Sequence, residues 1–177
     1  MLDAQSGEGL VVMSLTYEGL AREDSPSWSY HRLGSEKNLR IFTRAARVPL
    51  DWESPPGRLA VFALPTGRYE FYRCEFAGLS PGTNRHVWRT GKNGVVTPNN
   101  PSYSGFDTPS YTAIKAEPFV IRFEVSAGKV IYIGNLHLLW NEDERKGRVT
   151  LRDSSQRDLL LLQQKFPQIE RHQIIKN

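Results

Sequence analysis

Two segments of the chain, 61 positions apart, share one pattern: Phe62–Phe71 and Phe123–Tyr132. In each, an alternating apolar run leads into a short turn that ends in glycine, followed by a basic residue and a second apolar run. Glycine suits such a turn because it adopts positive φ angles without steric cost. Units of this kind are typical of antiparallel sheets. We therefore expect Gly67 and Gly128 to mark equivalent turns, flanked by solvated Arg68 and Lys129.

Strand-like runs also occupy most of the remaining chain and are separated by turn residues. We predict strands at Leu10–Tyr17, Trp28–Leu33, Leu39–Thr43, Arg58–Leu64, Arg68–Phe76, His86–Thr90, Phe119–Val125, Val130–Trp140 and Arg148–Leu151. Several alternate apolar and polar residues, as expected for strands with one buried face. Many short strands of this kind predict a mainly β fold, an antiparallel, immunoglobulin-like β-sandwich.

One α-helix is predicted near the C-terminus, at about residues 154–166. Asp153 or Ser154 caps its start, Gln156 stands in capping-box position, and Pro167 ends it. The expected apolar face, which we predict to pack on the sandwich, consists of Leu159, Leu160, Leu162 and Phe166.

Length and composition fit one soluble domain spanning residues 1–177. The chain has 39% hydrophobic and 24% charged residues and contains no apolar run of 18 residues, the length needed for a transmembrane helix. Cys74 is the only cysteine, so an intrachain disulfide is impossible. We interpret it as a packed structural thiol rather than a nucleophile.

Charge patterning argues against nucleic acid as a partner. The net charge is only +4, and the arginines are interleaved with apolar residues, which is typical of solvated strand faces. Glu70 and Glu75 fit the same interpretation, as surface charges that pair with Arg68 or Arg73. A less favoured alternative is a β-barrel that binds RNA or DNA. It requires aromatic side chains exposed among arginines on one face, with these candidates: Trp28, Tyr30 and Trp88.

No catalytic or metal-binding motif can be identified, so we nominate no catalytic residue, metal ligand or cofactor. The four histidines, His31, His86, His137 and His172, lack partners at metal-ligand spacing. His137 is best explained as a hydrogen-bonded sheet histidine, and the acidic run 142–144 as a solvated turn. The enzymatic alternative is a hydrolase that acts on an envelope polymer, with His86 or His137 beside an acidic residue.

The segment between Gly91 and Pro118 is the one long irregular region. Loops of more than about 12–15 residues without secondary structure are often functional. The segment contains three aromatic residues: Tyr103, Phe106 and Tyr111. One interpretation is a loop that packs across a sheet edge. The other is recognition of a partner or sugar by these aromatics, together with Trp88.

Two segments resemble a family of uncharacterised exported bacterial proteins, many of which look like lipoproteins: Phe119–Leu138 and Leu151–Pro167. Two earlier segments, Gly9–Leu15 and Leu64–Phe71, match the family's pattern as well. The chain is more distantly similar to transthyretin-like and carboxypeptidase-regulatory-like β-sandwiches.

The resemblance implies a location in the cell envelope, either in the periplasm or at the outer membrane. The leader, and any lipid anchor through which the protein would meet the membrane, would then be absent from this sequence. A native start at Met1 would instead imply a cytoplasmic protein. The family contributes no known catalytic residues. We therefore expect a non-enzymatic module that binds or scaffolds an envelope protein or a saccharide.

Overall fold

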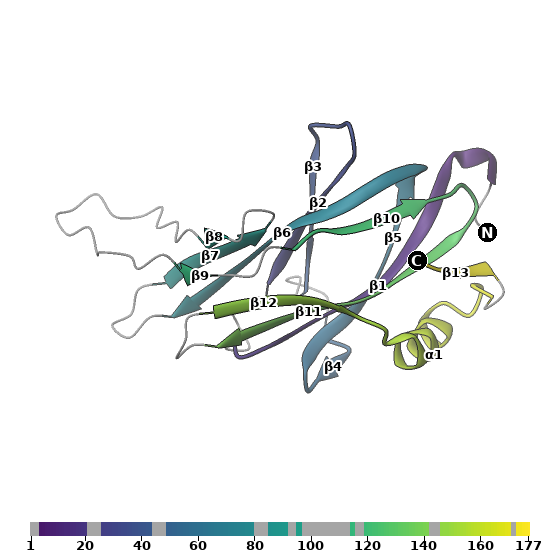
Figure 1. Cartoon of the computed structure of the whole chain (residues 1–177). Helices are drawn as coiled ribbons and strands as arrows, with labels where there is room; N and C mark the ends of the chain where they lie inside the picture. Colours follow the sequence, from purple (N-terminus) through teal and green to yellow (C-terminus); the bar gives the residue numbers. More distant parts are fainter. Residues whose placement is uncertain are drawn as a thin grey trace.

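The computed structural model describes residues 4–20, 26–43, 49–79, 85–91, 95–96, 114–115, 119–141, 146–170 and 173–177. These residues form two main β-sheets, a small two-stranded ribbon and one C-terminal α-helix (Figure 1). The predicted fold class, a mainly β sandwich with a C-terminal helix, is confirmed. No helix among the described residues is long and apolar enough to cross a membrane.

The larger sheet, sheet A, has six strands. Its order is β12 (Lys146–Arg152), β11 (Val130–Asn141), β1 (Glu8–Glu18), β5 (Pro56–Pro65) and β4 (Trp52–Glu53), with β13 (Ile174–Lys176) also paired to β11. The pairing is antiparallel except at β1–β11 and β11–β13, which are parallel. The prediction of a purely antiparallel sandwich was therefore too simple in this sheet.

The smaller sheet, sheet B, has five strands and is antiparallel. Its order is β10 (Ile121–Val125), β6 (Gly67–Leu79), β2 (Ser27–Arg32) and β3 (Asn38–Phe42), and β7 (Arg85–Gly91) also pairs with β6. A separate ribbon consists of β8 (Val95–Val96) and β9 (Ile114–Lys115), and a short 3-10 helix, η1, covers Ala4–Ser6. Every predicted strand overlaps an observed one, whereas β4, β8, β9 and β13 were not predicted.

The two repeated segments cross between the sheets. β5 lies in sheet A and β6 in sheet B, while β10 lies in sheet B and β11 in sheet A, so neither copy is a hairpin. Both turns bind the start of β1: Thr66 N donates to Gly7 O at 2.8 Å, and Gly128 N donates to Glu8 O at 2.8 Å. The two turns thus lie at the same place in the fold, but their conformations differ, with φ of +154° at Gly67 and +67° at Gly128. Arg68 and Lys129 beside them are exposed, as expected.

The main core fills the space between the sheets. It contains Val11, Met13, Leu15, Tyr17 and Trp140 from sheet A, and Trp28, Tyr30, Phe71, Cys74 and Phe123 from sheet B. Trp28 is fully buried and Tyr30 is 6% exposed, so they cannot form the exposed aromatic face that the nucleic-acid alternative required. Burial also raises the pKa of the Cys74 thiol, in agreement with a structural role.

A second core lies on the opposite face of sheet A, where α1 (Ser155–Lys165) packs. Leu162 is fully buried, and Leu159 and Phe166 are partly buried against the sheet. Leu160 was predicted to join this face but is 50% exposed. Positions 159, 162 and 166 share one side of a helix, whereas position 160 is rotated by about 100° from position 159.

The side-chain hydrogen bond at the start of the helix comes from Asp153. Its Oδ1 accepts a hydrogen bond from Ser155 N at 2.9 Å, while Ser154 makes no side-chain capping bond. This bond and the one to the Ser155 hydroxyl lower the pKa of Asp153. Ser154 therefore occupies the N-cap position, while Asp153, one residue earlier, provides the side-chain hydrogen bond.

Candidate functional site

A β-bulge in β11 brings a set of polar residues together beneath the start of α1. Val12 pairs with Tyr132 and Met13 with Gly134, which leaves Ile133 as the extra residue. Ile133 packs into the main core, so Asn135 and His137 lie on the same face of sheet A as Tyr132. Without this bulge, strict alternation would point Asn135 and His137 into the apolar core.

Asp158 is the centre of this polar network. It is fully buried, and its Oδ2 accepts hydrogen bonds from Ser14 Oγ at 2.6 Å and from Tyr132 OH at 2.7 Å. Its Oδ1 accepts from the Arg157 guanidinium, with Nε at 2.9 Å and NH2 at 2.8 Å. Burial, together with the bond to Asp158, raises the pKa of Tyr132. The network therefore joins the first turn of the helix to β1 and β11.

The hydrogen bonds continue from Ser14 across the sheet. Asn135 Nδ2 donates to Ser14 Oγ at 2.7 Å, and Thr16 Oγ1 donates to Asn135 Oδ1 at 3.0 Å. Since Thr16 has only one hydroxyl proton, its contact with His137 Nδ1 at 2.9 Å requires the ring to donate. The bonds thus run in one direction, from His137 toward the Asp158 carboxylate.

His137 is at the far end of the chain of hydrogen bonds and is 1% exposed. Its Nε2 has no hydrogen-bond partner, and the Glu18 carboxylate lies 3.5 Å away. Burial and nearby Arg152 lower the pKa of His137, whereas Glu18 opposes that shift. The neutral ring fits the predicted role of a hydrogen-bonded sheet histidine.

The serine of this network is a poor nucleophile. Ser14 Oγ donates its proton to Asp158 and accepts from both Asn135 and Arg157, which occupies its hydrogen-bonding capacity. It is fully buried, and no described histidine is hydrogen-bonded to it. The network is therefore suited to holding α1 on sheet A rather than to acyl transfer.

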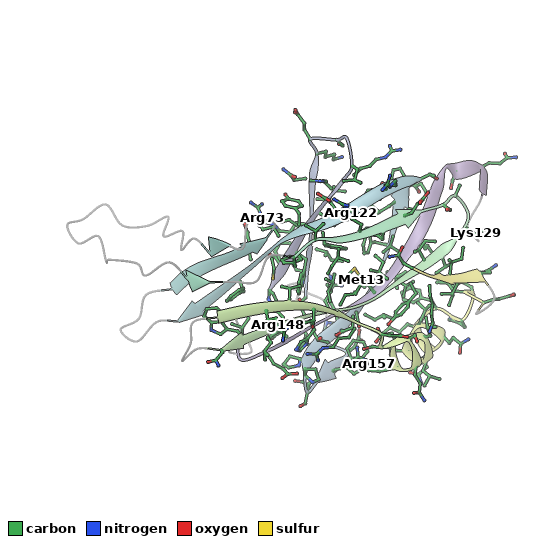
Figure 2. All side chains as sticks on the ribbon, in the orientation of Figure 1. Met13, Arg73, Arg122, Lys129, Arg148 and Arg157 are labelled. Atoms are coloured by element: carbon green, nitrogen blue, oxygen red, sulfur yellow. The ribbon has the colours of Figure 1, made fainter. Side chains whose placement is uncertain are left out.

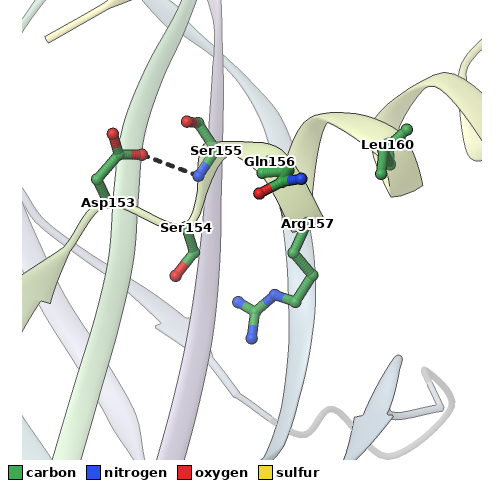
Figure 3. A pocket seen from close by; sticks show the side chains of 6 residues that line it. All are labelled: Asp153, Ser154, Ser155, Gln156, Arg157 and Leu160. Carbon is green, nitrogen blue, oxygen red and sulfur yellow. Dashed lines mark hydrogen bonds between the residues drawn. The ribbon is translucent and has the colours of Figure 1, made fainter.

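An open surface depression lies beside the network, at the start of α1, and shares Arg157 with it. It is lined by Asp153, Ser154, Ser155, Gln156, Arg157 and Leu160 (Figure 3). Arg157 extends away from the helix, and its guanidinium carbon lies 3.9 Å from the centroid of the Trp52 ring. Because Asp153 already bonds Ser155 N, and Lys176 Nζ donates to Ser155 Oγ at 2.7 Å, these groups are engaged within the chain.

A second polar surface covers the outer face of sheet B, and it also depends on a bulge. Ser29 pairs with Arg73 and Tyr30 with Phe71, so Tyr72 is the extra residue in β6. Phe71 and Cys74 belong to the main core, which leaves Tyr72 and Arg73 together on the outer side. Figure 2 shows Arg73 and Arg122 on the side of the molecule opposite Arg148 and Arg157.

Two carboxylates lie beneath this surface. Glu70 is fully buried; its Oε1 lies 3.1 Å from His31 Nε2, and its Oε2 lies 3.3 Å from Arg122 Nε. Glu75 has 8% of its side chain exposed and pairs with Arg40 at 2.9 Å and Arg73 at 3.3 Å. The expected Glu75–Arg73 pair is confirmed.

The interpretation of both glutamates as surface charges was wrong. They point outward from β6, but the long cationic side chains of neighbouring strands cover them. Side-chain exposure is 42% for Arg40 and 65% for Arg122, compared with 0% for Glu70. Arginine side chains therefore lie between these two carboxylates and the solvent.

An aromatic residue completes this outer face. The Tyr72 ring stacks on His31, with centroids 4.7 Å apart, and Tyr72 OH donates to Asn38 Oδ1 at 2.8 Å. The Arg73 guanidinium lies 5.6 Å from the ring centroid. We call the outer surface of β2, β3, β6 and β10 that carries Arg40, Arg73 and Arg122 the arginine face.

Most of the predicted binding residues belong to the part of the chain that the structure leaves undescribed. Tyr103, Phe106 and Tyr111 lie outside the described residues, as do His172 and residues 142–144. Trp88 and His86 belong to β7, opposite Phe76 and Gly78, but their side chains are not among those described. Within the described part of the chain, no group of three or more His, Cys, Asp or Glu residues could hold a metal ion.

Comparison with known proteins identifies no family. No protein-family model matches the chain, and neither does any curated protein. One solved structure is distantly similar: a leucine-rich repeat protein from Bacteroides thetaiotaomicron, with a TM-score of 0.38 and 11% sequence identity. The match covers 79% of this chain but only 14% of that protein.

Proposed function

We propose that this protein is a non-enzymatic binding or scaffolding module of the bacterial cell envelope. The observation that supports it best is the construction of the arginine face. Two buried glutamates hold exposed arginines against a rigid sheet, which orients unused N–H donors toward solvent. Such a surface is suited to recognition because its donors lose little conformational freedom on binding.

The polar network of sheet A favours the same proposal. Its serine hydroxyl is saturated by internal bonds, and its buried aspartate fixes the helix to the sheet. The side chains of this network that could in principle take part in catalysis therefore contribute to the rigidity of the fold. A rigid sandwich with a preorganised outer face is the arrangement that a binding module needs.

One specific contact favours the alternative, a hydrolase acting on an envelope polymer. The Glu18 carboxylate lies near His137 Nε2, and Thr16 contacts the other ring nitrogen. However, the side chains of Thr16 and His137 are each 1% exposed, and the Thr16 proton is directed to Asn135. A substrate could reach neither group without opening the sheet, so we favour binding.

Capture experiments with matched variants test the proposal. The wild-type protein is cross-linked to partners in cells of its source organism and compared with Arg40→Gln, with Tyr103→Ala/Phe106→Ala, and with His137→Asn. A saturable partner that is retained by His137→Asn is the expected result. Absence of any specific partner, together with hydrolysis of cell-wall material that His137→Asn abolishes, would contradict it.

The envelope location is part of this proposal and is supported by the resemblance of residues 119–167 to exported proteins. Fractionation of native cells with a specific antibody tests it separately. We expect the protein in the periplasmic or outer-membrane fraction. Recovery only with cytoplasmic markers would contradict the location while leaving the binding function open.

A further inference from the structure

We propose that the arginine face, together with the edge of β3 that points away from β2, binds an extended acidic segment of a partner polypeptide. This inference rests on the proposed binding function and identifies its surface and the chemistry of its partner. Three observations support it: the charge exposed on the face, the direction of the backbone groups of β3, and the repulsion that a second copy of the chain would meet.

The charge balance of the face favours an anionic partner. The carboxylates of Glu70 and Glu75 are covered, while Arg40, Arg73 and Arg122 each retain exposed side-chain surface. Each guanidinium has five N–H donors, more than its glutamate uses, and the fork matches a carboxylate in geometry. Exposed Glu124 lies opposite Arg68 on the β10 side of the sheet, away from β3.

The edge of β3 provides the second half of the site. Among the described residues, β3 pairs only with β2. Thr43 N donates to Pro26 O at 3.0 Å, and bonded and non-bonded pairs alternate in an antiparallel ladder. Asn38, Arg40 and Phe42 therefore direct their backbone groups away from β2, as confirmed by the bond from Arg58 Nε to Phe42 O at 2.7 Å.

An added strand would also meet the β3 side of the arginine face, at Arg40, whereas Arg73 on β6 and Arg122 on β10 lie further from this edge. Since side chains alternate along a strand, the residues whose backbone groups point away from β2 also carry the outward side chains Asn38, Arg40 and Phe42. Of these backbone groups, Phe42 O already accepts from Arg58 Nε. A peptide paired with β3 would thus set its own alternate side chains beside the Arg40 guanidinium and the Phe42 ring, which is 45% exposed. An acidic residue satisfies the contact with Arg40, and the methylene groups of a glutamate at the next outward position pack beside the Phe42 ring.

The same geometry disfavours a second copy of this chain. Arg40 is the central residue of β3, so a two-fold antiparallel pairing of two β3 strands over their full length would place Arg40 opposite Arg40. Like charges directly across a strand pair are destabilising. An acidic strand from another protein would instead place a carboxylate opposite Arg40, and the charge interaction would be attractive.

Fluorescence anisotropy with defined peptides tests this inference. The probe is a fluorescein-labelled peptide in which Glu alternates with Thr, and the control peptide carries Lys in place of Glu. We expect binding of the Glu peptide only, with Kd increased about fivefold to tenfold by Arg40→Gln and by raising salt from about 20 to about 200 mM. Arg148→Gln on β12 of sheet A removes the same charge elsewhere and should leave Kd unchanged.

Backbone pairing is tested with Glu peptides N-methylated at every second residue, in either phase. In a paired strand, the amide N–H groups of alternate residues face β3. The peptide methylated on the other residues should therefore bind, and the peptide methylated on the residues that face β3 should not. Equal binding of both phases, equal binding of the Lys peptide, or no effect of Arg40→Gln would overturn the inference. Tighter binding of heparin or duplex DNA than of the Glu peptide would also overturn it, by assigning the face to another polymer.

These outcomes are separable from failure of the proposed function. If the captured partner is retained by Arg40→Gln but lost with Tyr103→Ala/Phe106→Ala, the arginine face is wrong and the binding module stands. If the wild-type protein captures no partner at all, the proposed function itself fails.

Discussion

The fully buried Asp158 carboxylate provides the sharpest test of how this fold is held together. In Asp158→Asn, the Arg157 guanidinium loses its buried counter-ion, and one oxygen becomes an NH2 group facing a donor. Breaking a buried pair costs about 3–5 kcal/mol, and this value is reduced because 35% of the Arg157 side chain is exposed. An unsatisfied buried hydroxyl at Ser14 or Tyr132 adds about 1–3 kcal/mol.

We therefore expect Asp158→Asn to lower the free energy of unfolding by about 4 kcal/mol. For a chain of this size, that corresponds to a decrease in Tm of about 8 to 16 °C. Urea denaturation followed by tryptophan fluorescence measures the change, and thermal unfolding by circular dichroism checks the shift in Tm.

Asp153→Asn is the matched control, because it alters an exposed carboxylate at the start of the same helix. It should leave stability nearly unchanged, since asparagine also caps helices. If Asp158→Asn destabilised the protein no more than Asp153→Asn, the network would not be what fixes α1 to sheet A.

Three further measurements examine other parts of the structure. Leu162→Ala should lower the free energy of unfolding by about 2–5 kcal/mol, whereas Leu160→Ala, at an exposed position, should change it by less than about 1 kcal/mol. If urea titrations gave similar losses for the two variants, the assigned helix face would be wrong. Because the pKa of His137 is lowered in the folded state, its contribution to stability is present above about pH 6.5 and is lost as the pH falls further. His137→Asn should therefore weaken the pH dependence of the urea midpoint. An unchanged pH profile would contradict a neutral buried ring. Buried Cys74, whose pKa is raised, should react with a thiol reagent only after denaturation in urea, and rapid labelling of the native protein would contradict its burial.

Local patterns in the sequence predicted most of the fold. Alternation of apolar residues identified each long strand, and the acidic cap and Pro167 bounded the helix. The partner of each strand was not predictable from these patterns. The strands around Gly67 look like a hairpin, but β5 and β6 belong to different sheets, whose apolar sides face the same core from opposite directions.

The two polar surfaces were missed because each depends on one extra residue. Ile133 and Tyr72 shift the phase of their strands, so simple alternation assigns Asn135, His137 and Arg73 to the wrong side. A glycine within a long apolar strand, Gly134, was the available signal for the first bulge, since its φ is +121°. The second bulge has no comparable mark, although the pair Tyr72-Arg73 interrupts the alternation of β6.

The most direct test of the central claim is site-specific photo-crosslinking in native cells. A photoreactive phenylalanine analogue is placed at position 42 beside the arginine face, or at position 139 on sheet A, two sites of similar exposure. We predict a partner adduct from position 42 that Arg40→Gln strongly diminishes, and none from position 139. An adduct from position 139 alone would contradict the claim that sheet B provides the binding surface.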